Sequence, residues 1–404
     1  MSAPGLGAWR FVTTFGVVSL LADVVYEGAR SITGPLLASL GASAVVVGVV
    51  TGIGEAAALL LRIVSGPLAD RTGRFWAWTI TGYVLTVVSV PLLGVVGVLW
   101  AAGALIIAER VGKAVRSPAK DTLLSHATAV TGRGRGFAVH EAMDQIGAVA
   151  GPLAVAAMLV VFGGFGPTFA LLAIPGVGVV ALLIWLRARV PEPARYEVAE
   201  PPRSTAVADR PALRSLPRPF WTYAGFSAIT MTGFATFGVL SFHQVQRGLV
   251  PVAWVPVIYA AAMVADAVAA LATGWIYDRR GAVVLAALPV LAAVVPVFAF
   301  SGQLVAVIAG ALVWGAAVGV QESTLRAVVA DLVGPGRRAT AYGVYAAVLG
   351  VAAAGGGTLT GYLYEQSVPL LIGVMIGIQG LALAALPLVR RQAVSSSARS
   401  EDPQ

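Results

Sequence analysis

The chain of 404 residues contains no cysteine, three histidines and few charged side chains. Without cysteine it has no disulfide framework, no thiolate metal site and no thiol nucleophile. Charged residues make up 11% of the sequence, whereas a soluble domain carries about 25%. Hydrophobic residues make up 58%, and the mean hydropathy is +0.85. This composition predicts a polytopic membrane protein.

Signatures of enzymes are also missing. The sequence has no phosphate-binding P-loop, which excludes ATP as the direct energy source, and no dinucleotide-binding fingerprint or Ser/His/Asp set. His126, His140 and His243 do not have the spacing of metal ligands. We therefore expect a protein that is not an enzyme and needs no cofactor, and the histidines leave open whether it binds a metal.

Twelve apolar runs follow one another along the chain, and most exceed the ~20 residues that cross the hydrocarbon core of a bilayer. They lie at 9–39, 43–65, 75–96, 99–117, 137–162, 167–187, 219–246, 252–277, 282–300, 302–326, 340–364 and 369–389. The sequence predicts an all-α integral membrane fold with twelve transmembrane helices in two six-helix bundles. We expect the bundles at 1–190 and 218–390, a cytoplasmic linker rich in proline at 191–217, and a disordered cytoplasmic tail at 391–404.

Basic residues concentrate in alternate loops. The loops after the second, fourth, sixth, eighth and tenth runs contain thirteen of them, whereas the opposite side has Arg247 and almost nothing else. This bias predicts a multi-pass protein of the cytoplasmic membrane with both termini in the cytoplasm. Because the bias accounts for most of the net charge of +8, nucleic acid is not an expected partner.

A polar segment between the second and third runs recurs between the eighth and ninth. Gly66, Asp70, Arg71 and Gly73 correspond to Gly274, Asp278, Arg279 and Gly281 at a shared offset of 208 residues, and Arg74 closes the first copy. The first glycine of each copy predicts a close approach of two helices. Asp followed by Arg can pair with a neighbouring helix end, and the second glycine permits a turn with positive φ.

The first copy resembles the signature loop of the Major Facilitator Superfamily, of the form G-x-L-a-D-r-x-G-r. The resemblance implies two pseudo-symmetric bundles that work by alternating access. It also implies a conformational gate at Gly66, Asp70, Arg71, Gly73, Arg74, Gly274, Asp278 and Arg279.

Two further segments carry the resemblance. Arg110 stands in the middle of the fourth helix, as in members that move protons. Gly147, Gly151 and Pro152 match a G-x-x-x-G-P motif that exporters have in the fifth helix, although Val155 and Ala156 replace the double glycine that usually follows. Residues 109–148 are also similar to a poorly characterised prokaryotic group, some members of which are associated with nickel or iron export.

Charged residues inside the spans are the candidates for chemistry, since they are costly in lipid and face a cavity or each other. We expect a coupling and substrate cavity formed by Asp23, Glu27, Arg30, Glu55, Arg110, Lys113, Glu141, Asp144 and Asp266. Asp23, Glu27 and Arg30 share one helix face. The alternative is a set of closed ion pairs that hold the first bundle together. Acids outnumber bases in that bundle's spans, so at least one carboxylate is expected to bind a proton or cation reversibly, with Asp23 the first candidate and Glu27 the second.

The leading hypothesis is proton-coupled efflux, by antiport, of a small molecule or cation. The expected partners are that substrate, protons and the lipid bilayer, and we expect a monomer. Uptake by a symporter or facilitator stays open as the first alternative. A channel would need a ring of like residues along one pore, and a sensor would need a sizeable soluble domain, so these are weaker alternatives.

Overall fold

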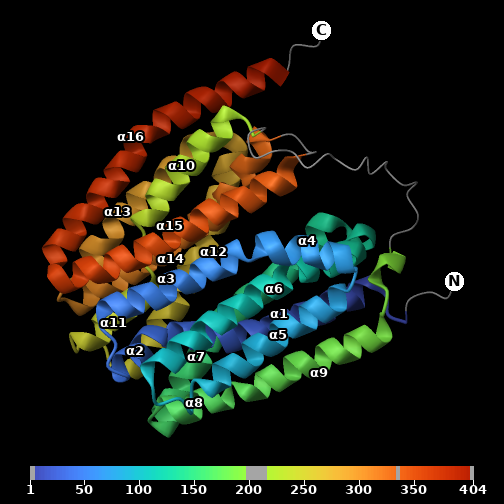
Figure 1. The fold of residues 1–404 in the computed structure, drawn as a ribbon, viewed down its shortest axis with the longest axis horizontal. Coiled ribbons are helices and arrows are strands. Elements are labelled where there is room, and N and C mark those ends of the chain that lie inside the picture. The colour runs from blue at the N-terminus through green and yellow to red at the C-terminus, as the bar shows by residue number, and fades with distance from the viewer. Residues whose placement is uncertain (1–4, 197–215, 334–336, 401–404) are drawn as a thin grey trace. The chain divides into compact units, whose positions relative to one another are not determined.

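The computed structural model describes residues 5–196, 216–333 and 337–400, and within these ranges it contains helices and no strand (Figure 1). The helices of the first part of the chain are α1 (Ala8–Ser31), α2 (Thr33–Ser39), α3 (Ala44–Leu60), α4 (Arg62–Thr72), α5 (Phe75–Leu92), α6 (Leu99–Thr131), α7 (Arg133–Phe162), α8 (Phe165–Leu171), α9 (Ala173–Arg189) and the short η1 (Pro193–Tyr196). The later helices are α10 (Arg218–Thr232), α11 (Phe237–Gln246), η3 (Val252–Trp254), α12 (Val255–Arg280), η4 (Gly281–Ala286), α13 (Ala287–Ala299), α14 (Leu304–Leu332), α15 (Arg338–Gln366) and α16 (Val368–Ser400).

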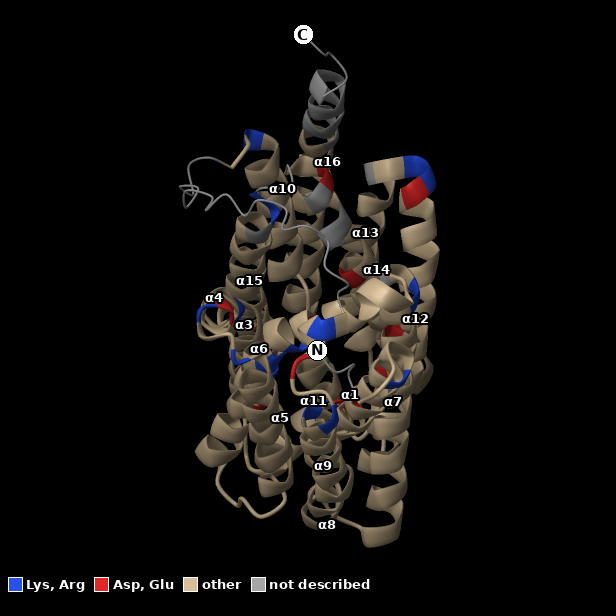
Figure 2. Cartoon of the chain, turned by 90° about the vertical axis from the view of Figure 1, so that its right-hand side faces the viewer, with Lys and Arg blue, Asp and Glu red and all other residues tan. Residues whose placement is uncertain are grey.

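Ten of the helical segments among the described residues are long and apolar enough to cross a membrane. The fourth and ninth expected spans are not among these ten helices. Four charged residues, Glu109 to Arg116, interrupt the apolar part of α6, and a short 3-10 helix shortens α13 at its start. With these two, the twelve expected spans are all helical, and Figure 2 shows how few charged residues interrupt them.

Several boundaries differ from those that the sequence predicts. The first run breaks at Ile32, between α1 and α2, and the seventh breaks between α10 and α11. Helix α6 continues to Thr131, so Lys120 lies on a helix and not in a loop. Helix α16 continues to Ser400, in a region expected to be disordered, and residues 401–404 of the predicted tail lie outside the described residues. Most of the predicted linker, 197–215, also lies outside them.

The contacts divide the chain into two units. The first comprises Met1–Leu40, Ala57–Ala206 and Val252–Ala260, and the second comprises Gly41–Ala56, Val207–Pro251 and Ala261–Gln404. These units differ from the predicted bundles in two segments, 41–56 and 252–260, each of which groups with helices from the other half of the sequence.

In the first unit, α1 packs against α7, α9 and α6, and α5 packs against α6 and α9 (Figure 1). Its aromatic core includes Phe11, Phe15 and Trp76. Tyr196 of η1 closes this core, since its ring lies 5.6 Å from that of Phe11 and its hydroxyl donates a hydrogen bond of 2.7 Å to the Leu6 carbonyl. Burial raises the pKa of the Tyr196 phenol to about 12, so this donor keeps its proton throughout the physiological range.

In the second unit, α10 packs against α15 and α16, and α13 packs against α14 and α16. The start of α3 belongs here because glycines bring its backbone against α15. A Cβ atom at Gly52 would lie 3.0 Å from the Ala354 carbonyl oxygen, and one at Gly48 would lie closer still to the carbonyl oxygen of Gly357. Glu365, at the end of α15, accepts a hydrogen bond of 2.8 Å from the Val45 amide in the first turn of α3. Small residues thus allow the backbone contact that draws 41–56 into this unit.

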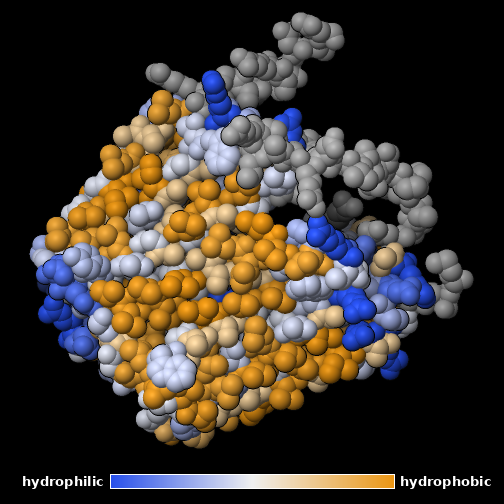
Figure 3. All heavy atoms as spheres, in the orientation of Figure 1, coloured by the Kyte–Doolittle hydropathy of each residue, from blue (hydrophilic) through white to orange (hydrophobic). Residues whose placement is uncertain are grey.

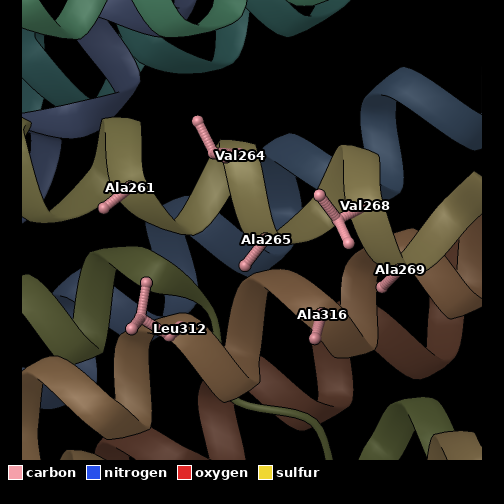
Figure 4. Close-up of a pocket in the computed structure, with 7 residues that line it drawn as sticks. All are labelled: Ala261, Val264, Ala265, Val268, Ala269, Leu312 and Ala316. Atoms are coloured by element: carbon pink, nitrogen blue, oxygen red, sulfur yellow. The ribbon is translucent and has the colours of Figure 1, made fainter.

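The surface of the helices is apolar, as expected for a protein in lipid. Figure 3 shows hydrophobic residues over most of the visible helices and hydrophilic residues at the margins of the view. An open groove of about 610 Å³ lies between α12 and α14, lined by Ala261, Val264, Ala265, Val268, Ala269, Leu312 and Ala316 (Figure 4). All seven lining side chains are aliphatic, so the groove suits hydrocarbon chains and has no group that would orient a polar solute.

Candidate functional site

The seam between α1 and α7 determines where the first candidate carboxylate lies. A Cβ atom at Gly147 would lie 2.5 Å from the Leu20 carbonyl oxygen and 2.7 Å from the Cβ of Asp23. At Gly151, a Cβ atom would lie 2.7 Å from Cα of Val24. The G-x-x-x-G-P motif of α7 therefore packs directly on α1, because its two glycines leave room for the α1 backbone. This contact turns Asp23 toward α7.

Asp23 and Glu27 are both buried, one turn apart on α1. Glu27 accepts a charge-assisted interaction from Arg30 at 3.5 Å. It also accepts a short hydrogen bond from the Tyr259 hydroxyl of α12, within the first unit. Asp23 interacts electrostatically with Glu27, Asp144 and Lys113. The buried carboxylates of Asp23 and Glu27 thus lie near the basic side chains Arg30 and Lys113. In such an arrangement a proton or a bound cation can take the place of a basic side chain as the partner of a carboxylate.

Basic residues of α6 interact with this pair, and aromatic rings contact two basic residues of the same helix. The Lys113 ammonium lies 4.7 Å from the centre of the Tyr26 ring. The Arg116 guanidinium lies 5.2 Å from the same ring and 4.6 Å from the ring of Tyr83. Arg116 also donates a hydrogen bond of 2.7 Å to Thr86. Ring faces attract these cations without neutralising their charge, so the carboxylates of α1 retain positive neighbours.

The predicted Arg110 lies beside the carboxylate of the preceding residue. Its Nε is 3.1 Å from Glu109 Oε2, and both side chains are buried. Arg110 also interacts electrostatically with Glu27. A cation that is adjacent to two buried acids fits the sequence-based hypothesis of a switchable partner, although it fits a closed structural pair equally well.

A second cluster links α7 with α1 and α6. Ser19 Oγ lies 2.8 Å from Nε2 of His140, and Nδ1 of His140 lies 3.6 Å from Asp144 Oδ2. The Lys120 ammonium lies 4.0 Å from the same Asp144 oxygen and 3.8 Å from Asp121. Asp144 therefore stands between the buried α1–α7 seam and the later turns of α6.

The expected cavity residues are divided between the two units. In the first unit, Asp23, Glu27, Arg30, Arg110, Lys113 and Asp144 belong to α1, α6 and α7. Glu141 is on α7 but exposed. Glu55 and Asp266 belong to the second unit, where Asp266 is buried beneath Gly319 of α14. Among the described residues, no group of three or more His, Asp and Glu side chains could hold a metal ion.

Sequence reasoning missed the neutral members of the site. Tyr26, Tyr83, Ser19 and Tyr259 contact its charged residues, yet none carries a charge that would have singled it out. Tyr26 offered a weak signal, since it lies three residues after Asp23 and therefore on the same face of α1. Tyr259 offered none, because it lies 232 residues from Glu27.

The repeated hinge is more helical than its sequence suggests. Gly66 to Thr72 lie inside α4, and the chain turns at Gly73. Gly73 and Gly281 have φ values of +61° and +60°, the left-handed conformation that the second glycine of each copy predicts.

The close helix approach expected at the first glycine is not found. A Cβ atom at Gly66 would be in ordinary contact with Pro118 at 3.7 Å, and one at Gly274 would meet no described atom within 4 Å. These two glycines are therefore not needed for backbone contact.

The charged pairs of the hinge lie at the surface. Asp70 and Arg71 of α4 are exposed, as are Asp278 and Arg279 of α12. Arg279 stacks on the Trp275 ring at 3.4 Å, so in the second copy the arginine has an aromatic neighbour on its own helix.

Comparison with known proteins gives consistent results along the whole chain. A family model described as the Major Facilitator Superfamily matches residues 20–357. Uncharacterized proteins of Mycobacterium tuberculosis and Mycobacterium bovis are 63% identical over 395 residues, which is 98% of this chain and 96% of each relative. An uncharacterized MFS-type transporter of Methanocaldococcus jannaschii is 25% identical over 370 residues, which is 88% of this chain and 89% of the relative.

Solved structures agree in fold. A nucleoside transporter matches with a TM-score of 0.72 at 14% identity, covering 94% of this chain and 99% of its own. A bacterial homologue of the human lysosomal transporter Spinster matches with a TM-score of 0.71 at 14% identity, covering 98% and 96%. A POT family transporter in complex with 5-aminolevulinic acid matches with a TM-score of 0.74 at 14% identity, covering 96% of each chain. The TM-scores establish a shared fold, whereas the low identities leave the substrate to be argued from the site itself.

Proposed function

The chain belongs to the Major Facilitator Superfamily of membrane transporters, and from this premise we propose that it is a proton-coupled exporter. It exchanges protons for a small molecule or cation by alternating access. In this proposal it acts as a monomer in the cytoplasmic membrane with both termini in the cytoplasm, and the predicted bundles 1–190 and 218–390 are its two moving halves.

One observation carries the proposal. Glu27 of α1 accepts a hydrogen bond from Tyr259 of α12 and pairs with Arg30, while Asp23 is buried one turn away. Tyr259 belongs to the later half of the sequence. A change in the charge of this carboxylate pair is therefore communicated directly to a helix that must move when the transporter changes state.

The exchange follows from competition for the carboxylates. With Asp23 and Glu27 both ionised, the pair attracts a cationic substrate from the cytoplasmic side. A proton that arrives from the outer side neutralises one carboxylate and displaces the substrate. Arg30 and Lys113 then rebalance the charge that is left, since both interact with Glu27. Each cycle moves one substrate out and at least one proton in.

The test uses everted membrane vesicles that respiration has acidified, with an acridine dye as reporter of the pH gradient. Ni²⁺, Fe²⁺ or the organic cation ethidium is added outside, at the cytoplasmic face of the protein. An antiporter exchanges the added cation for lumenal protons, so dye fluorescence recovers. An uptake symporter, the alternative, would release protons only when its solute is loaded inside the vesicle.

Asp23→Asn and Glu27→Gln are the decisive variants. We expect each to abolish proton-driven recovery and to retain downhill exchange of the responding cation. Glu192→Gln is the matched control, because Glu192 is an exposed acid that pairs with Arg195 at 2.7 Å outside the membrane spans. If both variants of α1 still couple cation movement to the pH gradient, α1 has a structural role and the proposal is wrong.

A further inference from the structure

We propose that Ser19, His140, Asp144 and Lys120 form a proton route that joins Asp23 to the cytoplasmic surface at Asp121. The inference rests on the proposed proton coupling, and it adds the path by which the proton leaves. It also separates Asp144 from the substrate cavity in which the sequence alone placed it.

The contacts form a continuous series. Ser19 Oγ is 2.8 Å from His140 Nε2, His140 Nδ1 is 3.6 Å from Asp144 Oδ2, and Lys120 Nζ is 4.0 Å from that oxygen. Asp121 follows, 3.8 Å from Lys120 Nζ. The first step has hydrogen-bond length, and the three longer steps are ion-pair distances between oppositely charged or ionisable groups. Because every member is an acid, a base or a hydroxyl, each can pass a proton or stabilise its passage.

The series runs from a buried end to an exposed end. Ser19 is 2% exposed, the side chains of His140, Asp144 and Lys120 are 4%, 21% and 16% exposed, and that of Asp121 is 61% exposed. The network therefore connects the buried seam with the surface. The exposed end lies on the part of α6 that follows the fourth expected span, 99–117, where the basic bias predicts the cytoplasmic side, and this gives the route its direction.

The buried end meets the coupling carboxylate. Ser19 and Asp23 are one turn apart on α1, and the closely packed Gly147 holds Asp23 against α7. Asp23 and Asp144 interact electrostatically. Asp144 Oδ1 is buried and has no hydrogen-bond partner among the described residues, so this oxygen is a vacant acceptor within the series.

Charged groups on three helices face Asp144. His140 is on its own helix, Lys113, Arg116 and Lys120 are on α6, and Asp23 is on α1. The proton leaves the Asp23 carboxyl group, passes the Ser19 hydroxyl and the His140 imidazole, and binds the Asp144 carboxylate. It then passes to water beside Asp121, and each relay group returns to its starting state. Lys120 keeps its charge and acts as a positioning residue that stabilises ionised Asp144 after the proton has left.

The experiment needs no substrate, because the proton is the probe. Purified full-length protein in lipid nanodiscs receives a rapid drop in pH, and time-resolved infrared difference spectra follow the carbonyl band of protonated carboxyl groups. The band that Asp23→Asn removes reports protonation of Asp23. We expect Asp144→Asn and His140→Gln to slow the rise of this band by about 100-fold, the low end of what a positioned acid–base group supplies. His140→Gln should leave the final amplitude of the band unchanged.

Further variants separate a relay from a structural role. Asp144→Glu keeps a carboxyl group and should keep the wild-type rate. Lys120→Arg keeps the positive charge and should also keep the rate, whereas Lys120→Met removes the charge and should slow the rise of the band. His140→Gln keeps a hydrogen-bonding group near Ser19 and remains informative if Asp144→Asn does not fold. Glu192→Gln, which changes a distant exposed carboxylate, should leave the rate unchanged.

The possible failures are distinct. If no carbonyl band disappears in Asp23→Asn, Asp23 is not the coupling residue, and both the proposed coupling and the proton route that begins at Asp23 are wrong. If the band is present and rises equally fast in Asp144→Asn and His140→Gln, the route is wrong, whereas the proposed proton-coupled export stands.

Discussion

Replacement of Gly147 by alanine tests whether the α7 motif is a packing device that positions Asp23. The added methyl group would lie 2.5 Å from the Leu20 carbonyl oxygen and 2.7 Å from Cβ of Asp23, too close for either atom to remain in place. Overpacking of this kind costs about 1–3 kcal/mol. Alanine also favours a helix over glycine by about 0.5–1 kcal/mol, which partly masks the cost.

Gly377→Ala provides the matched control. Gly377 lies within α16, and a Cβ atom there would meet no described atom within 4 Å. Both substitutions gain the same helix propensity, so it cancels when they are compared. We expect Gly147→Ala to be less stable than Gly377→Ala by about 1–3 kcal/mol, and Gly377→Ala to be at least as stable as the wild type.

The assay is intrinsic-fluorescence thermal unfolding in one detergent at one scan rate, because membrane proteins unfold irreversibly and their apparent midpoints depend on that rate. Proton-driven transport is measured in the same preparations and should fall in Gly147→Ala alone, since the methyl group displaces Asp23. Equal midpoints and equal transport for the two variants would refute the close α1–α7 contact and the role given to the motif.

Three further predictions concern topology, the hinge and the aromatic core. A reporter that works only in the cytoplasm should be active when fused after Gln404, because the basic bias of alternate loops predicts that this terminus is cytoplasmic, and activity of a periplasmic reporter there would reverse the topology. Asp70→Asn should reduce transport without loss of membrane expression, because we expect Asp70 to pair with a helix end in one state and to release it in the other; normal transport would make the hinge a packing device only. Tyr196→Phe should destabilise the protein by about 0.5–1.5 kcal/mol through the lost hydrogen bond to Leu6. Because burial raises the pKa of the phenol to about 12, its contribution is complete below the ordinary value of about 10 and is lost only as the pH rises through about 12, so unfolding should give the same difference at neutral pH and at about pH 9.

The sequence alone determined the family and the spans. Apolar runs long enough to cross a bilayer can satisfy their backbone groups in lipid only as helices, so composition and length predict them directly. The repeated hinge with Asp70 and Asp278 indicated the superfamily, which the match over residues 20–357 confirms. Positive φ at Gly73 and Gly281 followed from residue type, because a turn there excludes most side chains.

Local pattern could not determine the exact helix ends. The polar residues after Arg116 suggest a loop, yet α6 continues to Thr131 because its later turns, Leu123, Leu124 and Ala127, are buried in the core of the first unit. In the same way, Gly66 suggests close packing, and the fold places it beside Pro118 at an ordinary distance. Tertiary packing overrides local preference in both cases.

The tertiary structure alone determined which charged residues are partners. Sequence spacing relates Asp23 to Glu27 because both lie on one helix, but it cannot connect Glu27 with Tyr259 or Ser19 with His140, which are far apart along the chain. These contacts exist because glycines at 147 and 151 let α7 approach α1 and because the first six residues of α12 belong to the first unit. Which charged residues become partners depends on the distances between helices. At the α1–α7 seam, glycines set that distance because they have no side chain, and the charges that face each other then interact.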